Sequence, residues 1–232
     1  MKKALATFAL IALAAVAARA DVLGQWTFEN GGVSSATGAT FSYGPADSGA
    51  NAAGSAGGGS HAATNTAWTF PSGNGSTRSL SADRWAVNDY YQFSLSSGGY
   101  QGILLEWDQT GSNTGPRDFR LAYSTDGSAF TDFGTYSITN DSWTTGGAPK
   151  TQSHYSFDLS SVTALDNQAT VYFRLLDNST TSITGGTVAT GGTGRVDNFT
   201  VNASLIPEPS VVGLVGVGAA LLVGAMRYRK RS

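Results

Sequence analysis

Short runs of alternating apolar and polar residues recur along most of this 232-residue chain, and they restrict its fold more than any other feature. A period of two residues puts every second side chain on one face of a β-strand, so that one face meets a core and the other meets solvent. Between residues 21 and 206 no segment sustains helical periodicity, although 160–167 could form a single helical turn. The apolar positions of the runs are Trp26, Phe28, Tyr91, Phe93, Leu95, Ile103, Leu105, Trp107, Phe119, Leu121, Tyr123, Tyr155, Phe157, Leu159, Val171, Phe173, Leu175, Phe199 and Val201.

Turn-forming dipeptides separate the runs, among them Gly98-Gly99 and the hairpin turn Asp126-Gly127. Roughly eight or more strands without crossover helices exclude a parallel sheet, and the lack of a regular repeat excludes a propeller or a β-helix. We therefore predict an all-β fold, an antiparallel two-sheet β-sandwich of jelly-roll type over residues 21–205. The Gly-, Ser- and Ala-rich tract 44–60 is expected to be a long, mobile surface loop, with His61 beside it.

The composition excludes several kinds of active site. The chain has no cysteine, which removes disulfide scaffolds, thiolate metal sites and thiol nucleophiles. Its histidines are His61 and His154 and its glutamates are Glu29, Glu106 and Glu208, so little material remains for acid–base or metal catalysis. No phosphate-binding loop, dinucleotide fingerprint or nucleophile elbow occurs. We expect no catalytic residues and a protein that is not an enzyme.

The two ends of the chain differ from its body. Residues 1–20 carry two lysines, then a small and apolar run, then the small-x-small site Ala18-Arg19-Ala20. This order is typical of a secretory signal peptide with cleavage after Ala20. Near the other end, the uncharged segment 210–226 predicts one short transmembrane helix. The basic tail 227–231 is expected to stop transfer and to stay in the cytoplasm, and its charged residues are Arg227, Arg229, Lys230 and Arg231.

Residues 206–232 together resemble the PEP-CTERM sorting signal of Gram-negative bacteria. The resemblance rests on the motif Pro207-Glu208-Pro209, the short glycine-rich apolar segment after it and the Arg-rich end. It implies that the protein is exported, held transiently in the inner membrane by that helix, and processed near the motif by an exosortase. It also implies a final place at the cell surface or in the extracellular matrix, because family members accompany exopolysaccharide and biofilm production. The two prolines favour extended chain that a protease can reach.

The near-neutral net charge of −2 conceals an acidic body. When both ends are set aside, residues 21–206 hold seven basic and fifteen acidic residues, a net charge of −8. An acidic body without a basic stripe argues against a nucleic-acid partner. It suits solubility and the binding of divalent cations.

The first and last strands carry a second resemblance. The segments 27–31 (TFENG) and 194–199 (GRVDNF) resemble the opening and closing strands of jelly-roll carbohydrate-binding modules and related concanavalin-like sandwiches. In several such modules the equivalent acidic residues hold a structural Ca²⁺ ion, so the resemblance implies Glu29 and Asp197 as calcium ligands. Ca²⁺ takes about six to eight oxygen ligands and needs neither His nor Cys. An alternative stays open, in which Glu29 caps a turn and Asp197 pairs with Arg195 or with a backbone amide.

Glu106 and Asp108 lie two residues apart on one predicted strand, so they share a face. The segment 105–108 (LEWD) resembles the Glu-x-Asp core of laminarinase-like glycoside hydrolases, but Thr110 and Gly111 stand where that family has its second catalytic Glu. Both carboxylates are therefore expected to face solvent on a non-catalytic strand. Stacking against sugar rings is a further use for aromatic side chains, the candidates being Trp68, Trp85, Trp143, Tyr90 and Tyr100.

These observations favour a non-catalytic adhesion or polysaccharide-associated β-sandwich at the cell surface or in the matrix. Two alternatives stay open. One is a glycoside hydrolase or lyase on a concanavalin-like fold, and the other is a structural coat protein without a ligand.

Overall fold

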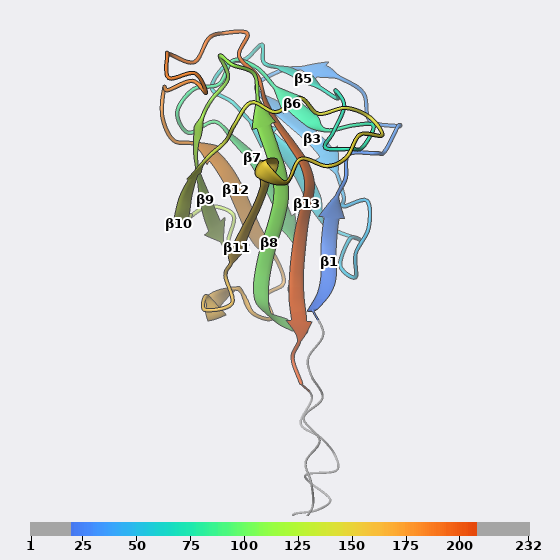
Figure 1. Ribbon diagram of the computed structural model, residues 1–232. Helices are drawn as coiled ribbons and strands as arrows, with labels where there is room; N and C mark the ends of the chain where they lie inside the picture. The colour runs from blue at the N-terminus through green and yellow to red at the C-terminus, as the bar shows by residue number, and fades with distance from the viewer. Residues whose placement is uncertain (1–19, 208–232) are drawn as a thin grey trace, which may run out of the picture.

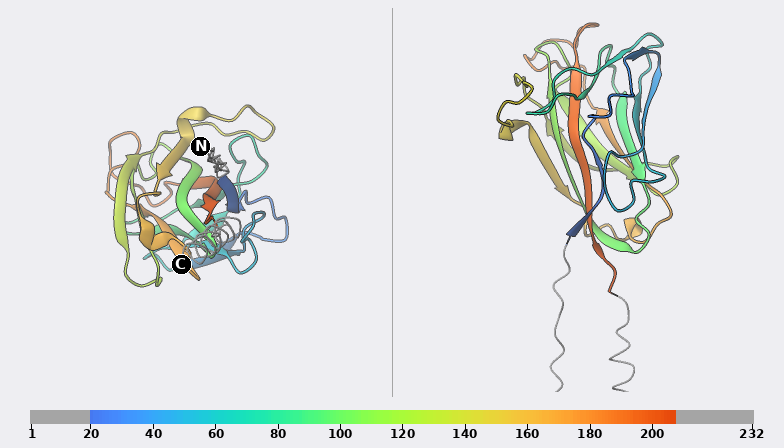
Figure 2. Two further views of the ribbon diagram at one scale, coloured as in Figure 1. Left: turned by 90° about the horizontal axis from the view of Figure 1, so that it is seen from below. Right: turned by 90° about the vertical axis from the view of Figure 1, so that its right-hand side faces the viewer.

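The structure is a computed structural model, and it describes residues 20–207. Two antiparallel sheets pack face to face (Figure 1, Figure 2), which confirms the predicted all-β two-sheet sandwich. Within residues 20–207, no helix has the length and apolar character needed to cross a bilayer. Residues 1–19 of the predicted signal peptide lie outside the described residues, as do Glu208 and Pro209 of the motif, the helix 210–226 and the basic tail.

The larger sheet has seven strands in the order β11-β8-β13-β6-β5-β2, and β1 also pairs with β13. β6 and β1 share one edge of β13, because β6 pairs with residues 194–196 and β1 pairs with residues 199–204. The strands are β1 (Ala20–Trp26), β2 (Ala36–Thr37), β5 (Ala67–Thr69), β6 (Leu80–Ala82), β8 (Tyr100–Gly111), β11 (His154–Asp158) and β13 (Gly194–Leu205).

The smaller sheet has six strands in the order β10-β9-β12-β7-β4-β3. Its strands are β3 (Thr40–Gly44), β4 (Ala56–Ser60), β7 (Tyr90–Leu95), β9 (Asp118–Ser124), β10 (Thr131–Ser137) and β12 (Val171–Asp177). The predicted hairpin turn joins β9 to β10, with Gly127 at a φ of 74° and the Asp126 carboxylate accepting hydrogen bonds from the amides of Ser128 and Ala129. Two short 3₁₀ turns, η1 (Thr151–Ser153) and η2 (Thr163–Leu165), complete the elements, and η2 lies where one helical turn was predicted.

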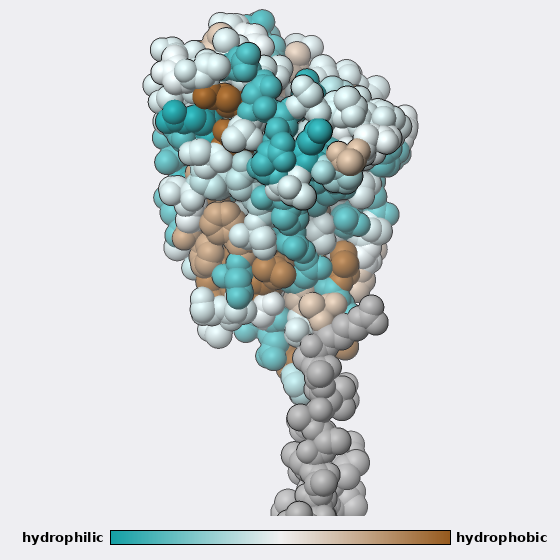
Figure 3. Space-filling view, viewed as in Figure 1, coloured by the Kyte–Doolittle hydropathy of each residue, from teal (hydrophilic) through white to brown (hydrophobic). Residues whose placement is uncertain are grey.

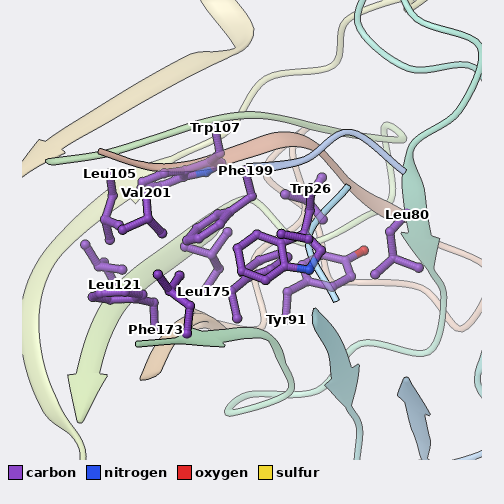
Figure 4. Close-up of a cluster of buried hydrophobic side chains, with 14 of the residues drawn as sticks. Trp26, Leu80, Tyr91, Leu105, Trp107, Leu121, Phe173, Leu175, Phe199 and Val201 are labelled. Atoms are coloured by element: carbon purple, nitrogen blue, oxygen red, sulfur yellow. The ribbon is translucent and has the colours of Figure 1, made fainter. Parts of the chain in front are cut away.

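The core between the sheets is strongly aromatic (Figure 4). Phe93 of β7 and Phe199 of β13 stack across the gap with ring centroids 3.8 Å apart, and Trp26 lies 5.1 Å from Phe93. The inward positions of every predicted run are buried or half-buried, so the alternation identified the core correctly. Each fully buried large apolar side chain contributes about 1.5–3 kcal/mol to the free energy of folding.

The Gly-rich tract 44–60 is not a surface loop throughout, and that expectation is wrong. Residues 56–60 form β4, an interior strand between β7 and β3. Gly57 faces Trp26 and Gly59 faces Trp68, and a Cβ atom at either glycine would come within 2.6 Å of the facing indole. The strand lacks side chains here because indoles from β1 and β5 already fill the space on its inner face.

The first strand closes the sandwich against the last. β1 runs antiparallel to β13 with Ala20 opposite Ser204, so both ends of the described chain lie at the same end of the sandwich (Figure 1). Two loops, 70–79 and 138–153, are joined near the other end by two hydrogen bonds between Asn74 and Lys150. They lie over the outer face of the seven-stranded sheet (Figure 1).

Candidate functional site

A shallow trough on the outer face of the six-stranded sheet is the first candidate binding site. It has a volume of about 250 Å³ and lies over β3, β4 and β7. Gly58 forms part of its floor, because Gly57 and Gly59 face the core and the residue between them faces outward, where a Cβ atom would meet the backbone carbonyl of Phe41 in β3. The polar and aromatic residues that line it are Thr40, Phe41, Ser42, Ser60, Tyr90 and Gln92.

Arg174 of β12 holds one wall of this trough in place. Its guanidinium lies between two rings, 3.9 Å from the centroid of Tyr90 and 3.7 Å from that of Phe130. Its Nε also donates a hydrogen bond of 2.8 Å to Oε1 of Gln92. Partial burial lowers the pKa of Arg174 from its usual value, but the group remains a cation. One aromatic ring and one amide are thus fixed side by side above a floor without a side chain, an arrangement that suits the hydroxyl groups and apolar face of a sugar.

Of the five aromatic residues suggested for sugar stacking, only Tyr90 lines this trough. Trp68 and Trp85 are 0% and 6% exposed, so they belong to the interior and offer no platform to a polymer, whereas Trp143, which is 5% exposed, lines a second pocket on the other sheet. Tyr100 is half-buried and packs against the core. For Trp68 and Trp85 the suggestion is wrong, because their rings fill space in the core between segments that are distant in the sequence.

Glu29 and Asp197 both bind the loop 73–78. Asp197 is fully buried, and its carboxylate accepts hydrogen bonds from the amide of Asn74 (2.9 Å), the hydroxyl of Ser76 (2.7 Å) and the amide of Asn198 (2.8 Å). The Glu29 carboxylate accepts hydrogen bonds from the hydroxyl of Thr77 and the amide of Arg78. The two proposed calcium ligands therefore both accept hydrogen bonds from donors on the same loop.

This geometry matches the alternative for Asp197, with backbone amides as partners in place of Arg195. Within residues 20–207, no group of three or more His, Asp or Glu side chains is placed to hold a metal ion. Burial raises the pKa of Asp197 to about 7, and Asp108, directly opposite on β8, adds repulsion between like charges.

A band of hydrophilic side chains runs along the outer face of the seven-stranded sheet, over β8 and β13 (Figure 3). Within it, Nδ1 of His154 lies 3.1 Å from Oδ1 of Asp108, and its Nε2 lies 3.7 Å from Oε1 of Glu106. Asn198 and Asn202 of β13 donate to the same two carboxylates, at 2.9 Å to Asp108 and 2.8 Å to Glu106. The residues form a network of mutual hydrogen bonds that joins β11, β8 and β13.

This network corrects the sequence interpretation in two respects. Asp108 is only 7% exposed, because Asn198 and His154 cover it, so it does not face solvent as expected. His154, which belonged to no site predicted from the sequence, stands opposite Asp108 in the β11–β8 register. Only the pairing of the two strands reveals this contact, since the residues are 46 positions apart.

His61, directly after the Gly-rich tract, is buried in the interior and does not belong to a surface loop. Its ring lies between Trp68 and Trp85, with centroid distances of 4.8 and 4.3 Å, and Nδ1 is 3.3 Å from the hydroxyl of Thr66. Burial lowers the pKa of His61 to about 4, so the ring is neutral at physiological pH. Its role is to pack between the two indoles.

Asp177, at the end of β12, is a second fully buried carboxylate. Its Oδ1 accepts a long hydrogen bond of 3.3 Å from the amide of Ser179, whereas Oδ2 has no partner among the described residues. Burial raises the pKa of Asp177 to about 7, and the nearby charges of Asp89 and Asp118 add to the shift. Nothing in the sequence pattern distinguishes this aspartate from the exposed ones.

No protein-family model matches the chain, and no curated protein is similar to it. Among solved structures, a cleaved adhesin domain of Lys-gingipain from Porphyromonas gingivalis is 14% identical, with a TM-score of 0.39, and the match covers 79% of this chain and 98% of that one. A CBM4 structure is 12% identical, with a TM-score of 0.34 and coverage of 77% and 84%. Endoglucanase 3 of Trichoderma harzianum is 11% identical, with a TM-score of 0.37 and coverage of 73% and 96%. The chain thus has a β-sandwich distantly similar to those of carbohydrate-binding modules and adhesin domains, and this similarity assigns it neither a family nor an activity.

Proposed function

We propose that this chain is an exported, non-catalytic protein of the cell surface or extracellular matrix, and that its sandwich, of jelly-roll type, binds polysaccharide at the trough over β3, β4 and β7. The observation that carries the proposal is the Gly58 floor beside the fixed pair Tyr90 and Gln92. A glycine strand creates an open channel on a sheet face, and a polymer can lie across such a channel without a deep pocket. Hydroxyl and amide groups along its sides offer both donors and acceptors to sugar hydroxyls.

The route to the surface rests on the two ends of the chain. The signal peptide at 1–20 directs export, the segment 210–226 holds the protein in the inner membrane, and an exosortase cuts near Pro207-Glu208-Pro209 in a Gram-negative cell. The fold supports such a tether, because β13 ends at Leu205, two residues before the motif. The sandwich would therefore stand directly on the membrane anchor, with no long linker between them.

A pull-down with a panel of insoluble polysaccharides tests the binding half of the proposal. The full-length chain, solubilised in neutral detergent, should be retained by at least one neutral polymer. Tyr90→Ala should weaken retention about tenfold or more, whereas Tyr90→Phe, which keeps the ring, should weaken it less. Tyr172→Ala is a matched control, because Tyr172 belongs to β12 in the same sheet but does not line the trough. No retention by any polysaccharide of the panel, or equal retention of Tyr90→Ala and the wild type, would count against the proposal.

The proposal of a non-catalytic protein rests on the state of the carboxylates on β8. A retaining glycosidase needs two carboxyl groups about 5–5.5 Å apart with room for a sugar between them. Here Glu106 and Asp108 are tied to Asn202, Asn198 and His154. We expect no turnover of β-glucans, measured as release of reducing sugar. Turnover by the wild type that Glu106→Gln abolishes would instead support the glycosidase alternative.

A further inference from the structure

A second pocket lies on the outer face of the seven-stranded sheet, at the end far from the chain termini. It has a volume of about 280 Å³ and is bounded by the last residues of β8, by the loop 140–143 and by Arg195 near the start of β13. We call it the distal pocket. It is separate from the trough, because the two lie on different sheets of the sandwich.

Arg195 carries the one positive charge that lines the distal pocket. Val196 and Gly194 face the core, so Arg195 between them faces outward, opposite Thr110 of β8. It is half-buried, and it makes no side-chain hydrogen bond or ion pair with any residue in the range 20–207. Burial lowers the pKa of Arg195 from its usual value, but the group remains a cation.

Arg195 differs in this respect from the other arginines that the structure describes. Four of those donate a hydrogen bond to a carboxylate, a carbonyl or an amide oxygen, whereas Arg84 lies only within ion-pair distance of Asp83 (3.9 Å) and its Nε has no hydrogen-bond partner among the described residues. The four donors are Arg78, Arg117, Arg120 and Arg174. Removing a guanidinium partly from water raises the free energy of the folded chain unless an anion or another acceptor binds its free N–H donors.

The one acidic residue that lines the pocket, Asp141, is already bound by its own loop. Asp141 accepts hydrogen bonds from Gln152, Ser153 and Thr139, which fixes its two oxygens toward the loop 139–153. Trp143 donates from Nε1 to the hydroxyl of Ser153 at 3.1 Å, so the same hydroxyl anchors the indole. The loop that forms one wall is therefore held in a single arrangement.

We propose that the distal pocket binds the carboxylate group of an acidic saccharide, with the guanidinium of Arg195 as its counter-charge. The planar fork of a guanidinium matches a carboxylate through two parallel hydrogen bonds. Because the pocket is lined by a single cation and also by the carboxylate of Asp141, a monoanion fits better than a doubly charged phosphate. The lining side chains Ser112, Asn140 and Ser142 carry the hydroxyl and amide groups that sugar hydroxyls pair with.

Isothermal titration calorimetry with a galacturonic acid trimer tests the proposal on the full-length chain in neutral detergent at physiological ionic strength. The matched probe is the galactose trimer of the same linkage, in which a CH₂OH group replaces each carboxylate. We expect the acidic trimer to bind about tenfold or more tightly than the neutral one, and Arg195→Gln to remove that preference. Asp141→Asn should strengthen binding of the acidic trimer severalfold, because it removes a negative charge beside the carboxylate.

Arg120→Gln is the control for general loss of positive charge, because Arg120 belongs to β9 in the other sheet and lines neither pocket. It should bind the acidic trimer like the wild type. Equal affinity for the two trimers, no binding of the acidic one, or equal loss in Arg195→Gln and Arg120→Gln would overturn the proposal. If Tyr90→Ala abolishes binding of the acidic trimer while Arg195→Gln retains it, the acid binds in the trough. The distal pocket is then excluded and the polysaccharide-binding function stands.

Discussion

The indole of Trp68 stands where a side chain on Gly59 would be, since a Cβ atom at that glycine would lie 2.6 Å from Cη2 of the ring. Real Cβ atoms do not approach a ring carbon so closely, so a larger residue at position 59 would require the indole or the strand to move. The indole also donates from Nε1 to the carbonyl oxygen of Gly38 at 2.9 Å, which fixes the ring in this place. An interior strand of glycines is therefore a requirement of the aromatic core.

Gly59→Ala should lower the free energy of unfolding by about 1–3 kcal/mol, because the added methyl group forces the indole or the strand to move. The matched control is Gly191→Ala, since a Cβ atom at Gly191 meets no atom within 4 Å and its φ is not positive. The control should stay within about 0.5 kcal/mol of the wild type. Urea denaturation followed by tryptophan fluorescence measures both, and an equal effect of the two substitutions would contradict the packing argument.

Asp177 should make the sandwich less stable as the pH rises. Its pKa is raised from 3.8 to about 7 in the folded chain, so the folded state holds the proton more tightly, and that stabilisation is lost as the pH rises through 7. Asp197 acts in the same direction, whereas His61, with a pKa lowered to about 4, contributes stability that is lost as the pH falls below 6.5.

Asp177→Asn removes that charge and keeps an oxygen for the Ser179 amide. At pH 8 the variant should be more stable than the wild type by about 2 kcal/mol, and its melting temperature should be roughly 4–8 °C higher. Near pH 4 the difference should vanish, because the wild-type carboxyl group is then protonated. Melting curves at several pH values check this. A wild type that is more stable at pH 8 than its Asp177→Asn variant would contradict it.

Asp197→Ala should destabilise the sandwich by about 2–4 kcal/mol, since it leaves the amide of Asn74 and the hydroxyl of Ser76 without their acceptor. The same variant tests the calcium hypothesis. An ion held by Glu29 and Asp197 would make the wild type melt at a lower temperature in chelator, and Asp197→Ala would be insensitive. We expect no effect of chelator on either chain, because the carboxylate oxygens already bind the loop 73–78.

Glu208→Ala should keep the chain in the membrane fraction of a Gram-negative cell that carries an exosortase. The wild type should lose a C-terminal tag and reach the cell surface, because the motif Pro207-Glu208-Pro209 is the expected processing site. Immunoblots of cell fractions measure both outcomes. Asp132→Ala, which changes an exposed acidic residue of β10, should be processed like the wild type. Cytosolic wild-type protein with both ends intact would contradict the export proposal.

The alternation of apolar residues was enough to predict the sandwich, because burial on one face of a strand leaves a period of two in the sequence. It failed for β4, because its three central residues, 57–59, are glycines and have no side chains to alternate. The information that makes residues 56–60 a strand lies in Trp26 and Trp68, whose rings need glycines beneath them. A signal of this kind is spread over distant positions of the sequence. The composition of the tract by itself therefore predicted a loop.

The candidate site residues also separate into features that the sequence pattern predicts and features that depend on contacts between distant segments. Glu29 and Asp197 were proposed from the sequence as calcium ligands, whereas the hydrogen bonds that both accept from the loop 73–78 follow from the packing of loops. For Asp197 the nearest of these partners in sequence is 121 positions away. The trough depends on Gly58 facing outward, and the distal pocket on Arg195 lacking a partner, so neither could be found without the strand register.

The pairing of β1 with β13 also determines how the molecule would bear a mechanical load. β13 carries hydrogen-bond ladders on both edges, to β8 on one side and to β6 and β1 on the other. Its path from Arg195 to Leu205 is roughly 33 Å long at about 3.3 Å per residue. The hydrogen bonds between antiparallel strands lie across the strand direction. Tension between a C-terminal tether and a polymer bound at the opposite end of the sandwich would therefore shear all of these bonds at once. The protein would resist such a pull strongly, because the hydrogen bonds of β13 would share the force and could not break one after another.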